Sequence, residues 1–165
     1  MKKSNNKGFS LVELIVVVAI MAVLVGVLAP AYLRYVEKTR LQKDNSAIGE
    51  VCAALQAGMA DEECYNEASV AAGAKVVSLT KDGLTYHGAL PNLEAEAQEV
   101  VGEYALTSKQ YSTSTIEIVV NAGTIYVKGF VDDAGDVATV GFVTGEGATC
   151  DGEYPNGLTT TKASE

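Results

Sequence analysis

Several residue types that build common active sites are scarce in this chain of 165 residues. It has a single histidine, His87, and so cannot form a multi-histidine metal site. Its three cysteines form no C-x-x-C pair, which disfavours zinc and thioredoxin-type sites. No Ser/His/Asp or Cys/His set with a supporting motif surrounds the histidine. These absences predict a chain that is not an enzyme and that uses no metal and no cofactor.

Basic residues are few once the first eight positions are set aside. Those positions hold three lysines and no acid, which leaves nine basic residues against all 21 acidic ones. Phosphate contacts need lysine and arginine, so the sequence predicts no nucleic-acid binding through a basic surface. An acidic body suits a soluble, solvent-exposed surface instead.

The most prominent feature that is present is an apolar run. After a short basic start, residues 1–8, the segment 9–33 carries only one charged side chain, Glu13. A membrane-spanning helix needs about 20 apolar residues, and this segment supplies them. The three lysines before it favour a cytoplasmic N-terminus.

Three ordinary explanations of this run compete. A secretory signal peptide could be cut at Ala29-Pro30-Ala31, giving a mature start near Tyr32, but the apolar run is long and the proline is awkward. A simple membrane anchor leaves Glu13 unexplained, although a carboxylate near the membrane edge costs less than the roughly 2.5–3.5 kcal/mol of mid-bilayer. A buried core helix would not be apolar on every face over this length.

Residues 8–13, GFSLVE, bring the leader, the run and the acid together. This hexapeptide, after a short basic leader and before an apolar helix, resembles the processing site of type IV prepilins. The resemblance implies cleavage by a membrane-embedded prepilin peptidase between Gly8 and Phe9, with N-methylation of Phe9. It also implies that Glu13 pairs with the new N-terminus of a neighbouring subunit during assembly. An ion in hydrocarbon needs a partner, and cleavage creates one. Pro30 marks a region that can lose helical order when such subunits pack.

The sequence predicts an α+β fold in which a long helix packs on a small antiparallel sheet, the pilin head. The helix is expected from Phe9 to about Ala60, half of it transmembrane and half under the head. The expected organisation is a cleaved cytoplasmic leader over 1–8, a transmembrane and assembly segment over 9–33, and an extracellular head over 34–165.

Turn and alternation signals place the remaining elements of the head. A loop with Cys64 follows the long helix. A helix begins near Pro91 with Asn92 as its cap. The tail from Gly145 to Glu165 is expected to be irregular. The predicted strands are Ala74–Leu79, Leu84–Leu90, Thr115–Val120, Thr124–Val131 and Val137–Val143, and the predicted second helix is Asn92–Leu106.

Two acidic groups could suggest chemistry but have simpler explanations. Asp132, Asp133 and Asp136 offer oxygen ligands for calcium, yet their spacing is not an EF-hand and suits a hairpin turn better. Four glutamates could mimic catalytic carboxylates, but a solvated acidic helix face is far more common. They are Glu94, Glu96, Glu99 and Glu103, the last three on one helical face.

The cysteines acquire a meaning from the resemblance, because many pilins close a C-terminal loop with a disulfide. Cys150 is placed to pair with Cys52 or Cys64, and the sequence does not choose between them. Such a bond closes a loop of roughly 90 residues and is worth about 4 kcal/mol in the loop-entropy model. Three free thiols are the alternative.

The resemblance implies a structural subunit of a type IV pilus, held in the inner or cytoplasmic membrane before assembly and in an extracellular filament afterwards. Its implied partners are copies of itself in a helical homopolymer, the prepilin peptidase, the assembly platform and the motor ATPases. Adhesion, surface motility and biofilm formation are the implied roles. A pseudopilin or minor pilin of a type II secretion or DNA-uptake machine is the alternative, and the motif does not separate the two.

Overall fold

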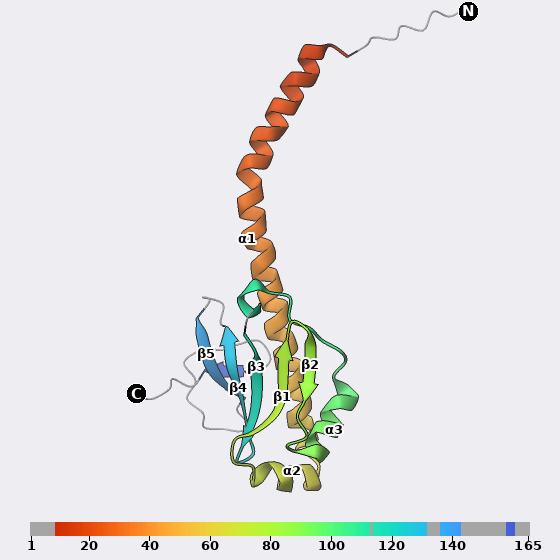
Figure 1. Cartoon of the computed structure of the whole chain (residues 1–165), viewed down its shortest axis with the longest axis vertical. Helices are drawn as coiled ribbons and strands as arrows, with labels where there is room; N and C mark the ends of the chain where they lie inside the picture. The colour runs from red at the N-terminus through yellow and green to blue at the C-terminus, as the bar shows by residue number, and fades with distance from the viewer. Residues whose placement is uncertain (1–8, 113, 132–135, 143–157, 161–165) are drawn as a thin grey trace, which may run out of the picture. The chain divides into compact units, whose positions relative to one another are not determined.

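The computed structural model describes residues 9–112, 114–131, 136–142 and 158–160. The chain divides into two compact units, residues 1–37 and 38–165. The first helix, α1 (Leu11–Gly58), begins in the first unit and ends in the second (Figure 1). Its end at Gly58 agrees with the expected end near Ala60, and its start lies two residues after Phe9.

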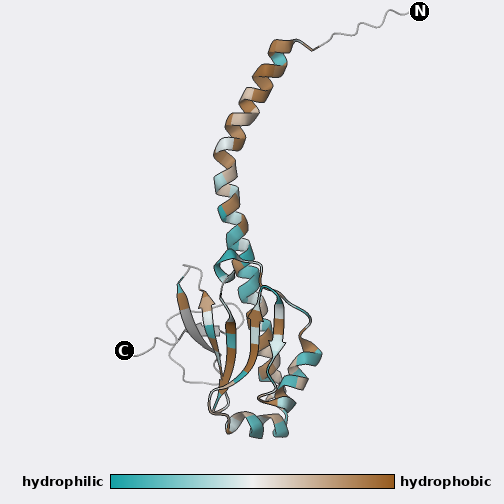
Figure 2. Ribbon diagram, in the orientation of Figure 1, coloured by the Kyte–Doolittle hydropathy of each residue, from teal (hydrophilic) through white to brown (hydrophobic). Residues whose placement is uncertain are grey.

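The first part of α1 exposes apolar side chains on every face. From Leu11 to Leu33 the large apolar side chains are about half or more exposed. Figure 2 shows this part of the helix as predominantly hydrophobic. Pro30 lies inside the helix and does not end it. Because a proline lacks an N–H, the carbonyl of Gly26 loses its helical donor there.

The second part of α1 is amphipathic and supplies one side of the core. Leu41, Ile48, Val51, Cys52 and Leu55 are buried on one face, at the helical spacing that the sequence predicted. These side chains belong to a single buried cluster with the strands, which includes Ile116, Ile118, Val127 and Phe130. The α+β fold and its helix-on-sheet core are thereby confirmed.

One six-stranded antiparallel sheet has the order β2-β1-β3-β4-β5-β6. The predicted meander of three strands is confirmed, with Ile118 opposite Val127 and Val127 opposite Val140. The strands are β1 (Ala74–Thr80), β2 (Gly83–Tyr86), β3 (Ile116–Asn121), β4 (Thr124–Val131), β5 (Val137–Phe142) and β6 (Leu158–Thr160).

Two predicted irregular stretches contain regular structure. The loop expected around Cys64 contains a helix, α2 (Glu62–Ser69), because the Asp61 side chain accepts hydrogen bonds from the backbone N–H groups of Glu63 and Cys64 and caps it. The tail expected to be irregular contains β6, which extends the sheet by pairing with β5. Both predictions were wrong at these residues.

The predicted second strand and second helix were both too long. β2 ends at Tyr86, because Gly88 has a positive φ of 71° and turns the chain away from the sheet. The helix α3 (Pro91–Val100) ends six residues before Leu106, where Val101 is extended and the Leu106 N–H donates to the Thr80 carbonyl.

The cap of α3 also differs from the prediction. The residue before the helix is Leu90, and Pro91 holds the first helical position, so Asn92 lies inside the helix. The buried Glu94 carboxylate accepts the N–H groups of Gly88 at 2.6 Å and Leu90 at 3.1 Å. Glu94 is therefore a structural cap rather than part of a solvated face, and Glu103 lies beyond the helix.

Candidate processing and assembly segment

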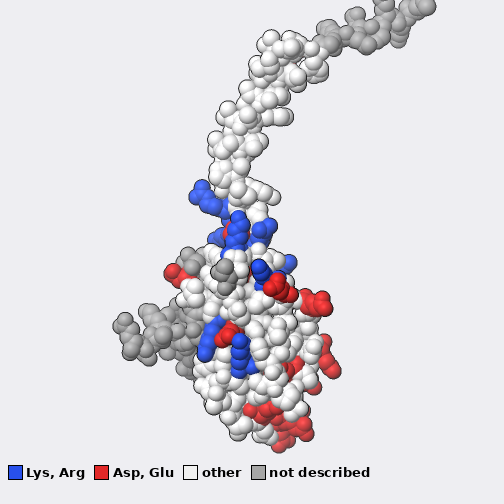
Figure 3. Space-filling view, in the orientation of Figure 1, with Lys and Arg blue, Asp and Glu red and all other residues white. Residues whose placement is uncertain are grey.

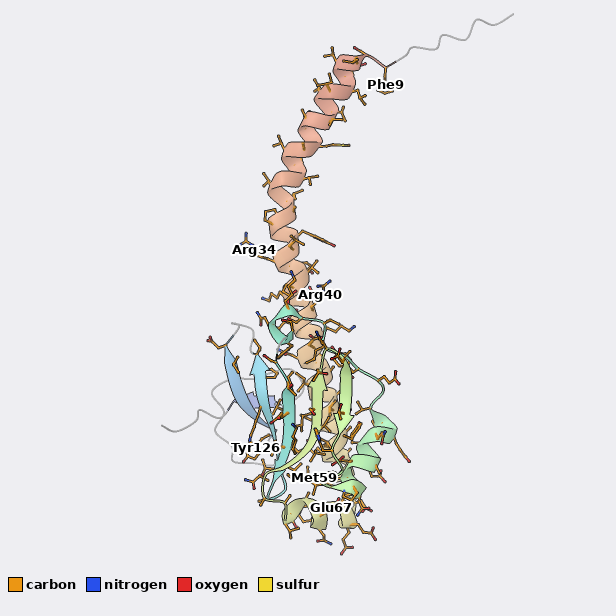
Figure 4. All side chains as sticks on the ribbon, viewed as in Figure 1. Phe9, Arg34, Arg40, Met59, Glu67 and Tyr126 are labelled. Carbon is orange, nitrogen blue, oxygen red and sulfur yellow. The ribbon has the colours of Figure 1, made fainter. Side chains whose placement is uncertain are left out.

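The segment that the sequence marks for processing is exposed. Phe9 is 91 % exposed and lies two residues before the start of α1 (Figure 4). The most apolar stretch of α1 contains no buried residue. By length and composition this helix can cross a membrane. Gly8 lies outside the described residues.

Glu13 has a definite position at the start of α1. Its Oε2 accepts a hydrogen bond from the backbone N–H of Ser10 at 3.0 Å. The carbonyl of Ser10 in turn accepts from the N–H of Leu14 at 3.2 Å. This is the glutamate half of a capping box, S-x-x-E, in which the acid satisfies a backbone donor ahead of the first turn. A carboxylate here also faces the positive end of the helix dipole.

Pro30 and Glu13 do not meet, since 17 positions of one helix separate them, about 25 Å at 1.5 Å per residue. The carbonyl of Pro30 accepts a hydrogen bond from Nε of Arg34 at 3.4 Å. Of the predicted residues at the start of the chain, Phe9 and Glu13 therefore lie close together and Pro30 lies apart. Among the described residues of this segment, the arrangement brings together no set of reacting groups, and Glu13 is exposed in the single chain.

A second site, Asp44, was missed in the sequence. Its carboxylate is fully buried on α1 and accepts four hydrogen bonds. Oδ1 accepts from the hydroxyls of Tyr104 at 2.6 Å and Thr107 at 3.0 Å, and Oδ2 from the backbone N–H groups of Thr107 at 2.9 Å and Ser108 at 2.7 Å. Burial, and then the hydrogen bond to Asp44, raise the pKa of the Tyr104 phenol.

The neighbouring Asn45 ties α1 to the sheet. Its Nδ2 donates to the Val131 carbonyl at 3.0 Å, and its Oδ1 accepts from the Tyr111 hydroxyl at 2.7 Å. That hydroxyl accepts from the Val131 N–H at 2.9 Å, so three residues far apart in the chain close a buried network. Two adjacent polar residues, Asp44 and Asn45, within the expected helix were the available signal, but the sequence alone does not reveal their distant partners.

Comparison with known proteins bears on the first of these sites. Residues 3–29 match the family model of the prokaryotic N-terminal methylation motif. Over 67 residues the chain is 33 % identical to the type IV major fimbrial protein FimA of Dichelobacter nodosus, covering 38 % of this chain and 42 % of that protein. FimA of D. nodosus strain VCS1703A is 34 % identical over 71 residues, covering 43 % of this chain and 44 % of that protein.

These findings support a type IV pilin. The chain spans less than half the length of the curated relatives it matches. No solved structure matches it. The matched motif and the similar N-terminal segments therefore describe the region of the apolar helix. The fold of the head is known from the structure described above.

Two of the three cysteines of this chain lie in the described residues. Cys52 on α1 and Cys64 on α2 are both buried free thiols and are not joined to each other. Burial raises the pKa of the Cys52 thiol to about 12, and burial followed by nearby Asp61 and Glu96 raises that of Cys64. Cys150 lies outside the described residues, so its pairing with either cysteine stays a prediction.

The other side chains considered for chemistry have structural roles where they are described. His87 Nε2 lies 2.5 Å from the Ser78 hydroxyl, and this hydrogen bond joins a serine and a histidine without the carboxylate of a catalytic triad. Among the described residues no group of three or more His, Cys, Asp or Glu is placed to hold a metal ion. Asp132 and Asp133 of the suggested calcium site lie outside the described residues.

Proposed function

We propose that this chain is a structural subunit of a type IV pilus, processed between Gly8 and Phe9 and polymerised into an extracellular filament. The observation that carries the proposal is the methylation motif over residues 3–29 joined to an apolar helix with no buried residue in its most apolar window. An unpartnered helix of this kind needs a membrane or other apolar helices around it. A pilin uses the first before assembly and the second afterwards.

The contact made by Glu13 suggests how processing and assembly are coupled. In the single chain its carboxylate is satisfied by the N–H of Ser10, one residue from the proposed cleavage site. Cleavage places an α-ammonium on Phe9 of each subunit. In the filament the Glu13 carboxylate then receives a neighbour's ammonium, which offsets the cost of holding the acid among apolar helices. Methylation of Phe9 leaves that positive charge in place.

The relatives bear on which kind of pilin this is. Those with similar N-terminal segments are named as major fimbrial proteins. We therefore propose a major pilin with a structural role and no enzymatic activity. Self-assembly, the prepilin peptidase, the assembly platform with its motor ATPases, and roles in adhesion, motility and biofilm formation belong to the same proposal.

A glycine substitution at the cleavage site tests this function. In cells that lack the chromosomal gene, Gly8→Val should leave the chain uncut in the membrane and the surface without filaments, because a side chain obstructs the narrow cleft of the peptidase. Gly102→Val is the matched control, since Gly102 lies outside the apolar segment and a Cβ there meets nothing within 4 Å. Normal processing and filaments with Gly8→Val would contradict the proposed cleavage.

A further inference from the structure

A cluster of basic side chains follows the apolar segment of α1 directly. Arg34, Lys38, Arg40 and Lys43 lie within ten residues that hold one acid, Glu37. All four are exposed, and Figure 3 shows lysine and arginine gathered on this stretch of the helix. Residues 44–165 hold only five basic residues against 19 acidic ones. We call these four residues the basic collar.

The collar surrounds the helix instead of lying on one face. At about 100° per residue, Lys38 lies about 40° from Arg34, Lys43 about 180° and Arg40 about 240°. A helix that lies flat on a membrane keeps its cations on one face, opposite its apolar side chains. A ring of cations at the end of an all-round apolar segment fits a helix that leaves the membrane through the headgroups.

The spacing along the helix matches the thickness of the headgroup layer. That layer is roughly 5–7 Å thick on each side of the hydrocarbon core. With Leu33 at the hydrocarbon edge, Arg34 lies about 1.5 Å and Lys38 about 7.5 Å further along the axis. Lys43 lies about 15 Å along it, within reach of the surface potential through a Debye length of about 8 Å.

We propose that the basic collar binds the headgroups of anionic phospholipids in the leaflet on the head side of the membrane, before the subunit enters the filament. This inference rests on the membrane-inserted stage of the proposed function. Anionic headgroups attract the collar and repel the acidic remainder of the head. The two effects together hold the acidic head away from the lipid surface while Arg34 and Lys38 stay at the headgroups.

Loss of the leader removes the lysines on one side of the apolar segment and leaves the collar on the other side. Before the proposed cleavage, three lysines precede the apolar segment and four basic residues follow it. After cleavage at Gly8 no lysine or arginine precedes it. The α-ammonium of Phe9 is then the one positive group ahead of the apolar segment, and the lysine and arginine charges near the membrane all lie on the head side. The lipid contact of the collar is therefore what the subunit gives up on extraction into a filament.

The experiment uses the full processed chain, reconstituted in vesicles of phosphatidylcholine with or without phosphatidylglycerol. Spin-labelled forms of both lipids report which one occupies the shell around the inserted protein. Each cation near an anionic surface is worth about fivefold in equilibrium constant. We expect a several-fold preference for phosphatidylglycerol that falls as salt is raised and is lost in R34Q/K38Q.

The matched control is K81Q/K128Q, which removes the same charge from two exposed lysines of the head. It should keep the preference. Equal occupancy by the two lipids in the wild type would overturn the inference. This is also the result expected if the collar pairs only with an acidic surface of a second copy. Loss of the preference in the control as well would also overturn it. Flotation and protease protection report insertion separately, so a chain that inserts without lipid preference contradicts this inference alone.

Discussion

The phenol of Tyr104 donates to the Asp44 carboxylate at 2.6 Å, across 60 positions of sequence. This bond joins α1 to the segment that follows α3, and the N–H groups of Thr107 and Ser108 reinforce it on the other carboxylate oxygen. The segment contains no helix or strand between Val101 and Thr107, so these bonds replace a regular hydrogen-bond ladder. Asp44 thus joins α1 to a stretch of chain that has no regular backbone ladder of its own.

Asp44→Ala should lower the free energy of unfolding of the head by about 3 kcal/mol, because it leaves the N–H groups of Thr107 and Ser108 without their acceptor. Thermal unfolding of the full chain in mild detergent, followed by tyrosine near-ultraviolet circular dichroism, measures this. Glu50→Ala is the control, an exposed acid on the same helix, and should change stability by less than about 0.5 kcal/mol. Equal midpoints for both variants would show that the Asp44 bonds are not stabilising.

The turn between β3 and β4 holds an alanine in a strained backbone conformation that a substitution could relieve. Ala122 has a φ of 48° and is followed by Gly123 at 76°, both in the left-handed region. An alanine there is disfavoured relative to asparagine, which tolerates this conformation. Ala122→Asn should raise stability by about 1 kcal/mol, and Ala122→Val should lower it because a branched side chain suits the turn least. Chemical denaturation of the two variants would give opposite shifts; a shift of the same sign in both would refute the presence of strain at this turn.

An ion pair on the sheet gives a pH dependence of known sign. Lys75 Nζ lies 2.6 Å from Glu117 Oε1 across β1 and β3, and the hydrogen bond from Lys75 holds the pKa of Glu117 below its ordinary value of 4.5. A depressed carboxyl pKa adds stability above the unfolded-state pKa that is lost as the pH falls through the folded value. Both side chains are more than a third exposed, so the contribution is at most about 1 kcal/mol.

The measurement is the unfolding midpoint of the wild type and of Glu117→Gln from neutral pH down to about pH 3. The wild type should be the more stable at neutral pH, and the difference should vanish once the pH is well below 4.5, the ordinary pKa of the glutamate. A difference that grows on acidification would contradict a lowered pKa for Glu117.

Glu13→Val should still insert in the membrane but should give few filaments, because the variant has no carboxylate to receive the neighbour's N-terminus. Counting filaments by electron microscopy, and comparing membrane and sheared fractions by immunoblot, separates insertion from assembly. Glu37→Gln is a control further along α1 and should assemble at normal yield. Normal yield from Glu13→Val would remove the proposed pairing.

The sequence predicted those elements whose cause is local. The apolar segment, the end of α1 near Gly58 and the three-strand meander follow from hydropathy and alternation, which the structure retains. The end of α3 does not follow from these local patterns. The N–H of Leu106 donates to the carbonyl of Thr80, so a contact between residues far apart in the sequence replaces the helix expected there. The roles of Asp44 and Asn45 could not be predicted for the same reason. A polar residue on the buried face of a helix is explained only by its hydrogen-bond partners, which lie far away in the sequence.

The nature of the N-terminal segment could be predicted because it contains a short, recognisable motif. Residues 8–13 lie inside the match to the methylation motif, and the exposed apolar helix follows in the structure. The capping contact between Glu13 and Ser10 could have been predicted from the S-x-x-E spacing alone. Where the peptidase cuts, and what Glu13 contacts in a filament, depend on other chains and so lie outside what one folded chain contains.

Intact mass and N-terminal sequencing of this protein, sheared from cell surfaces, test the central claim most directly. The account predicts a filament fraction whose subunits begin at N-methylated Phe9 and lack residues 1–8, which would establish processing and assembly together. A subunit that begins near Tyr32 and is recovered from the soluble supernatant would mean an ordinary exported protein, and would contradict the proposed pilus subunit.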